Sequence, residues 1–260
     1  METSLTVGHG SCAFRILLTH AAAPQLEHSR KKQCDLWAFV WASGSVCADV
    51  LWTTSCDFSM RSLQIAELGA GTGLPSLVAC HHCGATVLAT DLVPDALELI
   101  ELNSSRLTNE RSGSLATLRL DWGAAAATEA IAGAYHVVVG ADILYLGSSV
   151  RSVLRTAWHM LIPGGVLVLV DPGRPTTDSL EDDAASIGFD LVLRVEAAEY
   201  QTPVALMPKL VIFLLQKHGG GRDDTCIALA AAAKEVVSRT SAAASTVRRG
   251  YTLDVSTTTK

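Results

Sequence analysis

Five carboxylates stand at the ends of five short apolar segments, which makes them the first candidates for chemistry in this chain. They are Glu67, Asp91, Asp121, Asp142 and Asp171. Each apolar segment has the length and the composition of a buried strand. Because the carboxyl ends of the strands in a doubly wound parallel sheet share one edge, where ligands bind, we expect these carboxylates to line one ligand-binding crevice.

A glycine turn follows the first of these segments. The stretch from Ile65 to Leu74 is typical of a strand, a turn and the start of a helix, with Gly69, Gly71 and Gly73 at alternate positions. Glycine accepts a positive φ and lets a ligand approach the backbone without meeting a Cβ. The amides at such a helix start face outward and suit an anionic or hydrogen-bonding group. The turn is a weak signal alone, and the carboxylates downstream strengthen it.

Two kinds of cofactor compete for such a crevice, a nicotinamide or flavin dinucleotide and S-adenosylmethionine. The dinucleotide fingerprint needs its third glycine at the position of Leu74, but that glycine falls at Gly73. Glu67 would repel a pyrophosphate, whereas a carboxylate suits an amino-acid tail beside a sulfonium. Asp91 can accept both ribose hydroxyls of either ligand. The glycine spacing and Glu67 therefore favour S-adenosylmethionine.

The adenine end of that ligand would meet the segment after the third strand. Asp121 offers a carboxylate to the adenine amino group, and Trp122 offers a ring to its face.

Strands alternate with helical stretches from about residue 63 to 173, which is the βαβ pattern of a parallel sheet. A further helix is expected over 178–187, and two last strands over 189–195 and 210–216 would form an antiparallel pair at the sheet edge. The predicted fold class is α/β, a Rossmann-like doubly wound seven-stranded sheet that is mostly parallel with an antiparallel edge pair.

We divide the chain into an N-terminal extension (1–35), an S-adenosylmethionine-dependent domain (36–218) and a flexible or partly helical tail (219–260). Residues 1 to about 13 are expected to be loose, 14–20 to form an edge strand, and 227–237 to form an appended helix before a disordered end.

Composition excludes several classes of function. The chain has 260 residues, 49% hydrophobic and 18% charged, with a net charge of −6, so a general nucleic-acid binder is not indicated. No apolar run approaches the roughly 20 residues of a membrane span. Seven cysteines at irregular spacing form no disulfide framework. We expect a monomer in the cytoplasm, with the nucleus and the mitochondrion as alternatives, and neither nucleic acid nor membrane as partner.

A metal site is the less favoured interpretation of Cys80-His81-His82-Cys83. A second pair of ligands at finger spacing is missing, and the segment falls where the first helix should end. We therefore predict no metal.

Several motifs together resemble the seven-β-strand class I methyltransferases of the methyltransferase-like protein-lysine methyltransferase family, the relatives of enzymes that modify Hsp70 and other chaperones. The motifs are Trp41, the segment 67–73, Thr90-Asp91, Asp121-Trp122-Gly123 and the segment 140–145. The resemblance covers about residues 37–216. It implies a donor site made by Trp41, Gly69, Ala70, Gly71, Asp91, Trp122 and Ala141.

The same resemblance places Asp142 and Tyr145 beside the acceptor lysine of a protein substrate, as the catalytic pair. Two departures from the family pattern affect the substrate rather than the donor site. Ala42 stands where the family usually has an acidic residue, and the segment from Asp171 to Pro175 resembles only some members. Asp171 and Arg174 are interpreted as a turn with its salt bridge rather than a substrate clamp, and Trp37 as a core residue.

Alternatives remain open at this point. The acceptor could be a small molecule, or an arginine or histidine side chain, and the chain could be a donor-binding module that acts through a partner without turnover. A dehydrogenase is the least favoured interpretation of the sequence.

Overall fold

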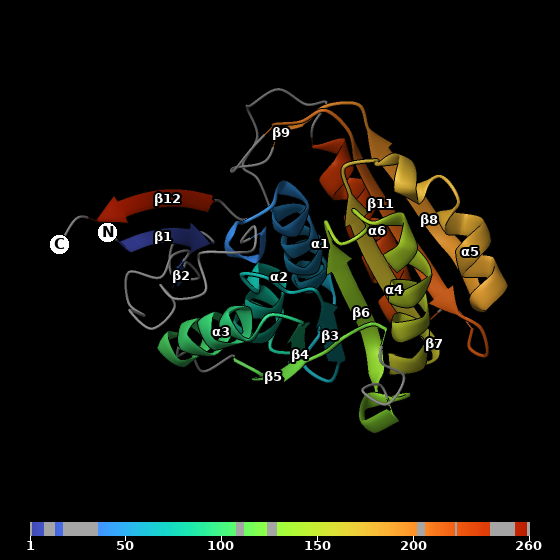
Figure 1. Cartoon of the computed structure of the whole chain (residues 1–260), viewed down its shortest axis with the longest axis horizontal. Helices are drawn as coiled ribbons and strands as arrows, with labels where there is room; N and C mark the ends of the chain where they lie inside the picture. Colours follow the sequence, from blue (N-terminus) through green and yellow to red (C-terminus); the bar gives the residue numbers. More distant parts are fainter. Residues whose placement is uncertain are drawn as a thin grey trace.

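The computed structural model describes residues 2–7, 14–17, 36–107, 112–123, 129–201, 206–221, 223–239 and 253–258. Its centre is a seven-stranded sheet of order β5-β4-β3-β6-β7-β11-β8 (Figure 1). Four neighbouring pairs are parallel, and β11 runs antiparallel to both β7 and β8. This confirms the predicted fold class and its antiparallel edge pair. The strands are β3 (Gln64–Leu68), β4 (Thr86–Asp91), β5 (Ser114–Arg119), β6 (Tyr135–Ala141), β7 (Leu161–Asp171), β8 (Phe189–Ala197) and β11 (Leu210–Lys217).

Helices cover both faces of the sheet, as Figure 1 shows. α1 (Ala42–Asp57), α2 (Leu74–Leu77), the π-helix η5 (Val78–His82) and α6 (Asp224–Ser238) contribute to one hydrophobic cluster. α4 (Gly147–Met160) and α5 (Leu180–Ile187) contribute to the other. α3 (Pro94–Arg106) packs on β4 and β5. Short 3-10 turns lie at η4 (Leu36–Ala38), η7 (Glu129–Ile131) and η8 (Pro175–Thr177).

The sequence explains these layers. Successive side chains of a strand point to opposite faces, so Val137 and Val139 join the cluster under α1 while Val138 joins the cluster under α4. Both faces need apolar residues, which is why the central strands are continuously hydrophobic rather than alternating. Gly188 ends α5 with φ of 113°, a conformation that favours glycine.

α6 is packed into the domain. Asp223 caps it by accepting the Cys226 amide at 2.9 Å, and Leu229, Ala233 and Val236 are fully buried against the cluster that α1 also enters. Arg239 ties the end of α6 to Asp49 of α1 at 3.1 Å. The expected helix over 227–237 is thus present and slightly longer. The division of the chain at residues 218 and 219 stays a prediction.

The two ends of the chain pair with each other, which corrects two expectations. β1 (Glu2–Val7) lies between β2 (Phe14–Leu17) and β12 (Leu253–Thr258) in an antiparallel sheet of order β12-β1-β2 (Figure 1). Residues 2–7 were expected to be loose and 253–258 disordered. Their pairing partners are at opposite ends of the sequence, so a local pattern does not reveal them. The strand expected over 14–20 is confirmed for 14–17, and 18–20 lie outside the described residues.

Two negative findings hold for the described ranges. No helix there combines the length and the apolar character that crossing a bilayer requires. No cluster of three or more histidine, cysteine, aspartate or glutamate side chains there is arranged to hold a metal ion.

Candidate functional site

The carboxyl ends of β3, β4, β6 and β7, called the carboxyl rim below, meet along one edge of the sheet (Figure 1). The register pairs Leu68 with Thr90 on one side and with Gly140 on the other, and Ala141 with Val170. Residues just beyond these positions therefore share the rim. The side chains of Asp91, Asp142 and Asp171 reach it as the sequence predicted.

The glycine turn directly follows β3 and therefore lies at the carboxyl rim. Gly69 has φ of 62° and Gly71 has φ of 54°, a region that side chains other than glycine rarely adopt. A Cβ on Gly69 would also lie 2.8 Å from the Ile143 side chain and 3.2 Å from the Trp122 ring. A Cβ on Gly71 would lie 3.1 Å from the carbonyl oxygen of Trp37. Both glycines are required by backbone conformation and by close neighbours.

Asp91 fastens the glycine turn to the end of β4. Its Oδ2 accepts the Gly71 amide at 2.9 Å, and its Oδ1 accepts the Val93 amide at 2.9 Å. The carboxylate is 8% exposed. A carboxylate has about four lone-pair positions, so two amides leave capacity for two hydroxyl donors. Asp91 holds the turn and has acceptor capacity left, while its role toward a ribose stays a prediction.

Glu67 faces the first helix after the turn. Its Oε2 accepts the Ser76 amide at 2.9 Å and the Ser76 hydroxyl at 2.5 Å, and the residue is 2% exposed. Burial raises the pKa of Glu67 to about 8, although both bonds from Ser76 favour the charged form and Asp91 opposes it. The described contacts of Glu67 are therefore structural, since they join β3 to α2.

Four further residues of the predicted donor site are Trp122, Asp121, Ala70 and Ala141. The edge of the Trp122 ring approaches Gly69, and the Leu120 amide donates to the Asp91 carbonyl at 3.0 Å, which anchors this segment to β4. Asp121 is exposed and its Oδ1 accepts the Gly123 amide at 2.8 Å. Ala70 donates its amide to Thr90 at 2.9 Å and is buried, and Ala141 is half-buried at the end of β6.

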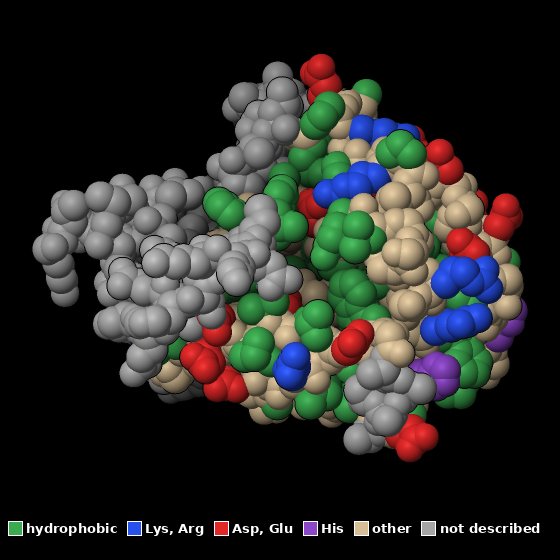
Figure 2. Space-filling view, viewed as in Figure 1, with side chains coloured by type: hydrophobic (Ala, Val, Ile, Leu, Met, Phe, Trp, Pro, Cys, Tyr) green, Lys and Arg blue, Asp and Glu red, His purple; other side chains and the backbone are tan. Residues whose placement is uncertain are grey.

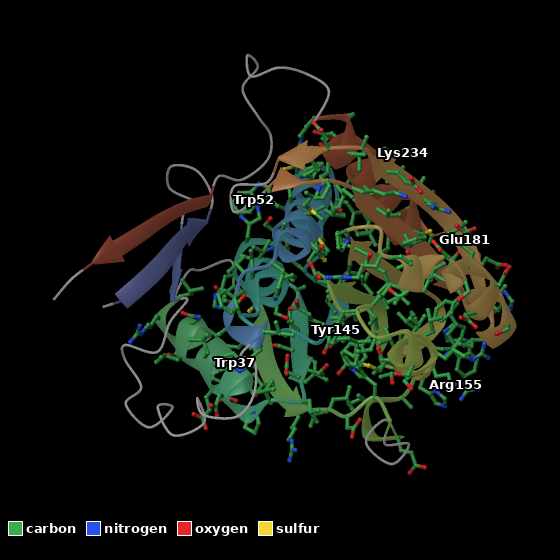
Figure 3. The ribbon with its side chains drawn as sticks, turned by 45° about the horizontal axis from the view of Figure 1, so that its top comes forward. Trp37, Trp52, Tyr145, Arg155, Glu181 and Lys234 are labelled. Atoms are coloured by element: carbon green, nitrogen blue, oxygen red, sulfur yellow. The ribbon has the colours of Figure 1, made fainter. Side chains whose placement is uncertain are left out.

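An aromatic segment before α1 closes one side of the turn. Trp41 is the residue before α1; its Nε1 donates to the Leu36 carbonyl at 2.8 Å, and its ring meets the edge of Phe39 with 6.3 Å between centroids. Trp41 is 43% exposed, and its place in the donor site stays a prediction. Trp37 was expected in the core, but it is only half-buried and its backbone covers Gly71. In Figure 3, Trp37 and Tyr145 lie in the lower half of the view, and Trp52, which belongs to α1, lies in the upper half.

Asp142 sits at the end of β6 with both carboxylate oxygens bound by the protein. Ser43, in the first turn of α1, donates its hydroxyl to Oδ2 at 2.9 Å, and Arg174 forms an ion pair with Oδ1. Asp142 has φ of 61°, the left-handed conformation that aspartate tolerates better than most residues. The side chain is 9% exposed. Ser43 and Arg174 were not among the predicted site residues.

Arg174 also binds Asp171, in the turn with a salt bridge that the sequence predicted after β7. Its amide donates to Asp171 Oδ1 at 2.8 Å and its guanidinium to Asp171 Oδ2 at 2.8 Å. Asp171 is completely buried. The spacing of three residues was a visible signal for this pair, but the second bond of Arg174, to Asp142, depends on β6 and β7 lying side by side.

Tyr145 and Leu146 form the exposed lip next to Asp142. They are 49% and 54% exposed, which is high for large apolar side chains. Figure 2 shows hydrophobic side chains gathered around a hollow in the middle of this face, where α1, β6 and α4 meet in Figure 1. Two large side chains on the segment that follows Asp142 are therefore open to solvent.

The Cys80–Cys83 segment lies in and after η5, away from this rim. The two imidazole nitrogens of His81 contact the hydroxyls of Ser112 and Ser104 at 3.0 and 3.1 Å, and burial raises the pKa of Cys83 to about 12. These residues are used in packing and hydrogen bonding within the fold.

A family model described as lysine methyltransferase matches residues 22–179, more than half of the chain. Among curated relatives, the mouse protein-lysine methyltransferase METTL21E is 33% identical over 144 residues, which cover 54% of this chain and 58% of the relative. Mouse EEF1A lysine methyltransferase 3 is 35% identical, over 53% of this chain and 56% of the relative. The chain thus spans somewhat more than half the length of the curated relatives it matches.

Solved structures share the fold. A putative RNA methyltransferase from Pyrococcus horikoshii superimposes with a TM-score of 0.52 at 17% identity, over 66% of this chain and 83% of that one. A SAM-dependent methyltransferase from Methanosarcina mazei also has a TM-score of 0.52, at 15% identity, over 62% of this chain and 94% of that one. At such identities the likeness concerns the fold alone.

Proposed function

Since the chain belongs to the lysine methyltransferase family, we propose that it transfers a methyl group from S-adenosylmethionine to the side-chain amine of a lysine in a protein substrate. One observation carries this proposal. The glycine turn held by Asp91 and the fixed carboxylate of Asp142 lie on the same carboxyl rim, which supports a donor site next to an acceptor site beside the exposed Tyr145.

The donor set fits S-adenosylmethionine. Asp91 has acceptor capacity left for the two ribose hydroxyls, and Gly69 and Gly71 present backbone without a Cβ. Trp122 offers a ring beside Gly69, and Asp121 a carboxylate next to it for the adenine amino group. The cofactor would supply an electrophilic methyl group on a sulfonium. The part of the protein is then mainly to align the acceptor with that methyl group.

The acceptor end suits an amine that must lose its proton. A free lysine amine has a pKa of about 10.4, and partial burial at the rim lowers it because the charged form is less well solvated. Asp142 attracts the ammonium and then orients the neutral amine. Tyr145, exposed at the lip, covers it with its ring or hydroxyl. Water can take the proton, and no dedicated base is assigned.

The test uses the purified full chain, methyl-labelled S-adenosylmethionine and a heat-treated cell lysate, in which endogenous methyltransferases are inactive. Labelled bands are resolved on a gel, and hydrolysis identifies the modified amino acid. We expect one or a few bands that yield methyl-lysine. Asp142→Asn should abolish most labelling with unchanged donor affinity, because asparagine tolerates the left-handed backbone but carries no charge. Asp182→Asn, an exposed change on α5, is the matched control.

Other results would contradict the proposal. Label found only in small molecules, or in methyl-arginine or methyl-histidine, would change the acceptor. Donor binding without label anywhere would favour a non-catalytic module. Full activity in Asp142→Asn would remove Asp142 from the mechanism.

Three narrower parts of this proposal are a chaperone as substrate, a monomeric enzyme and a cytoplasmic location. The identity of the labelled band tests the first, size-exclusion chromatography with light scattering the second, and fractionation of cells that express the chain the third.

A further inference from the structure

Given the proposed lysine methylation, on which this inference rests, we propose that Arg174 is a positioning residue for the acceptor: it fixes the Asp142 carboxylate and leaves the acceptor end with one net negative charge. The sequence pattern alone indicated only a salt bridge within the turn after β7. The structure extends that salt bridge to the neighbouring strand.

The first argument is geometric. Arg174 is held by Asp171 through both its amide and its guanidinium, each at 2.8 Å, and the same guanidinium binds Asp142. Asp142 and Asp171 follow adjacent strands, and the Asp142 amide donates to Val170 at 3.0 Å. Ser43 holds the other oxygen of Asp142. The carboxylate is therefore clamped from two sides by groups that belong to α1 and to the turn after β7.

The second argument concerns charge. Asp142 and Asp171 are shielded from solvent, with side chains 9% and 0% exposed, and one guanidinium stands between them. Two carboxylates and one guanidinium leave one net negative charge, which a single lysine ammonium balances. Without Arg174 the two carboxylates would hold the ammonium more strongly and favour its charged form, which cannot accept a methyl group. With Arg174 present, a fixed positive charge helps the ammonium to lose its proton.

Other charged groups near the turn balance among themselves. The aliphatic chain of Lys209 lies against Gly173, next to Arg174, while its ammonium pairs with Glu196 at 3.2 Å. Arg194 also pairs with Glu196 and reaches Glu181 at 3.0 Å. Tyr145 is the remaining titratable side chain at the lip, on the segment that follows Asp142. Of the described groups at this end, Arg174 is thus the cation that contacts Asp142.

The test compares the full-length wild type with Arg174→Gln and Arg174→Lys. Initial rates of methyl-lysine formation in heat-treated lysate are measured from about pH 6 to pH 10, at several concentrations of lysate protein. For Arg174→Gln we expect the rate at saturating lysate to fall about tenfold or more, and the acidic limb of the pH profile to move to higher pH. Arg174→Lys should show the wild-type pH profile but only part of the wild-type rate. Lysine keeps the positive charge but lacks the planar guanidinium that binds both Asp142 and Asp171.

Loss of the Arg174 guanidinium also leaves the buried Asp171 without its charged partner, which is expected to destabilise the variant by itself. The double variant Asp171→Asn/Arg174→Gln removes one charge of each sign and should recover the melting temperature. Under the proposal the acceptor end again has one net negative charge, so the pH profile returns toward that of the wild type, while the rate at saturating lysate stays low because the guanidinium that fixes Asp142 is missing. A double variant with the wild-type rate and profile would reduce Arg174 to a stabilising ion pair and overturn the inference.

Failure of this inference differs from failure of the proposed function. An active wild type whose Arg174→Gln variant keeps rate, lysate dependence and pH profile contradicts the inference alone. If the wild type labels no lysine, the proposed function fails, and a crystal structure of Arg174→Gln decides the positioning role. An Asp142 carboxylate that stays in place would then overturn it, and a displaced carboxylate would support it.

Discussion

The Oδ2 atom of Asp91 lies 2.9 Å from the backbone nitrogen of Gly71, so the carboxylate at the end of β4 holds the glycine turn that follows β3. One side chain therefore holds the glycine turn and, under the proposed function, offers acceptors to the ribose of the donor. If both uses hold, a substitution of Asp91 should affect donor binding strongly.

Asp91→Ala should weaken the binding of S-adenosylmethionine by about tenfold or more. A hydrogen bond to a charged group contributes about 1.5–3 kcal/mol, and this change also frees the Gly71 amide. Isothermal titration calorimetry with S-adenosylmethionine measures the effect. Glu98→Gln, an exposed change on α3, is the control. Equal affinity in both variants would contradict the assignment of Asp91 to the donor site.

Gly73→Ala should destabilise the fold by about 1–3 kcal/mol, whereas Gly44→Ala should be neutral or stabilise it by up to about 1 kcal/mol. Gly73 has φ of 73°, and its added Cβ would lie 2.5 Å from Ile100. Gly44 lies inside α1 with nothing within 4 Å of an added Cβ. Chemical denaturation of the two variants measures the difference. Similar effects of both changes would show that the turn tolerates a side chain.

The free energy of unfolding should fall as pH rises from about 5 to about 8. Burial raises the pKa of Glu67 to about 8, so between its unfolded value near 4.5 and that value the native state binds more protons than the unfolded state. One such proton gives a slope of at most about 1.4 kcal/mol per pH unit. Burial also raises the pKa of Asp49 to about 6, despite Arg239, and adds to the lower part of this range.

Glu67→Gln should therefore flatten the decline between about pH 6 and pH 8 and leave, below pH 6, only the smaller decline that comes from Asp49. Urea denaturation at several pH values measures the slopes. Glu98→Gln should keep the wild-type slope, since that side chain is exposed. An unchanged slope in Glu67→Gln would mean that Glu67 is charged in the native protein.

Leu229→Ala should cost about 2–5 kcal/mol, because α6 is part of the core. Leu229 is completely buried in the cluster shared with α1, while Ile227, two residues earlier, is 58% exposed. Ile227→Ala should change stability by no more than about 0.5 kcal/mol. Chemical denaturation of the two variants measures the contrast. Equal small effects would mean that α6 is an appendage of a domain that ends near residue 218.

The sequence by itself determined the sheet, the glycine turn and the carboxylates of the carboxyl rim. These features are local: strand hydrophobicity follows from burial on both faces, and the residue after a parallel strand reaches the ligand-binding edge wherever that strand lies. The family resemblance added the role of Asp142 and Tyr145 at the acceptor end, which stays a prediction.

Only the tertiary structure decided which charges meet. The spacing of Asp171 and Arg174 indicates their turn, but the bond from Arg174 to Asp142 requires β6 and β7 to be neighbours, and the bond from Ser43 requires α1 to begin at the rim. The pairing of β1 with β12 likewise joins residues at opposite ends of the chain. Such contacts depend on distances in space between segments far apart in sequence, which no local pattern of residue types encodes.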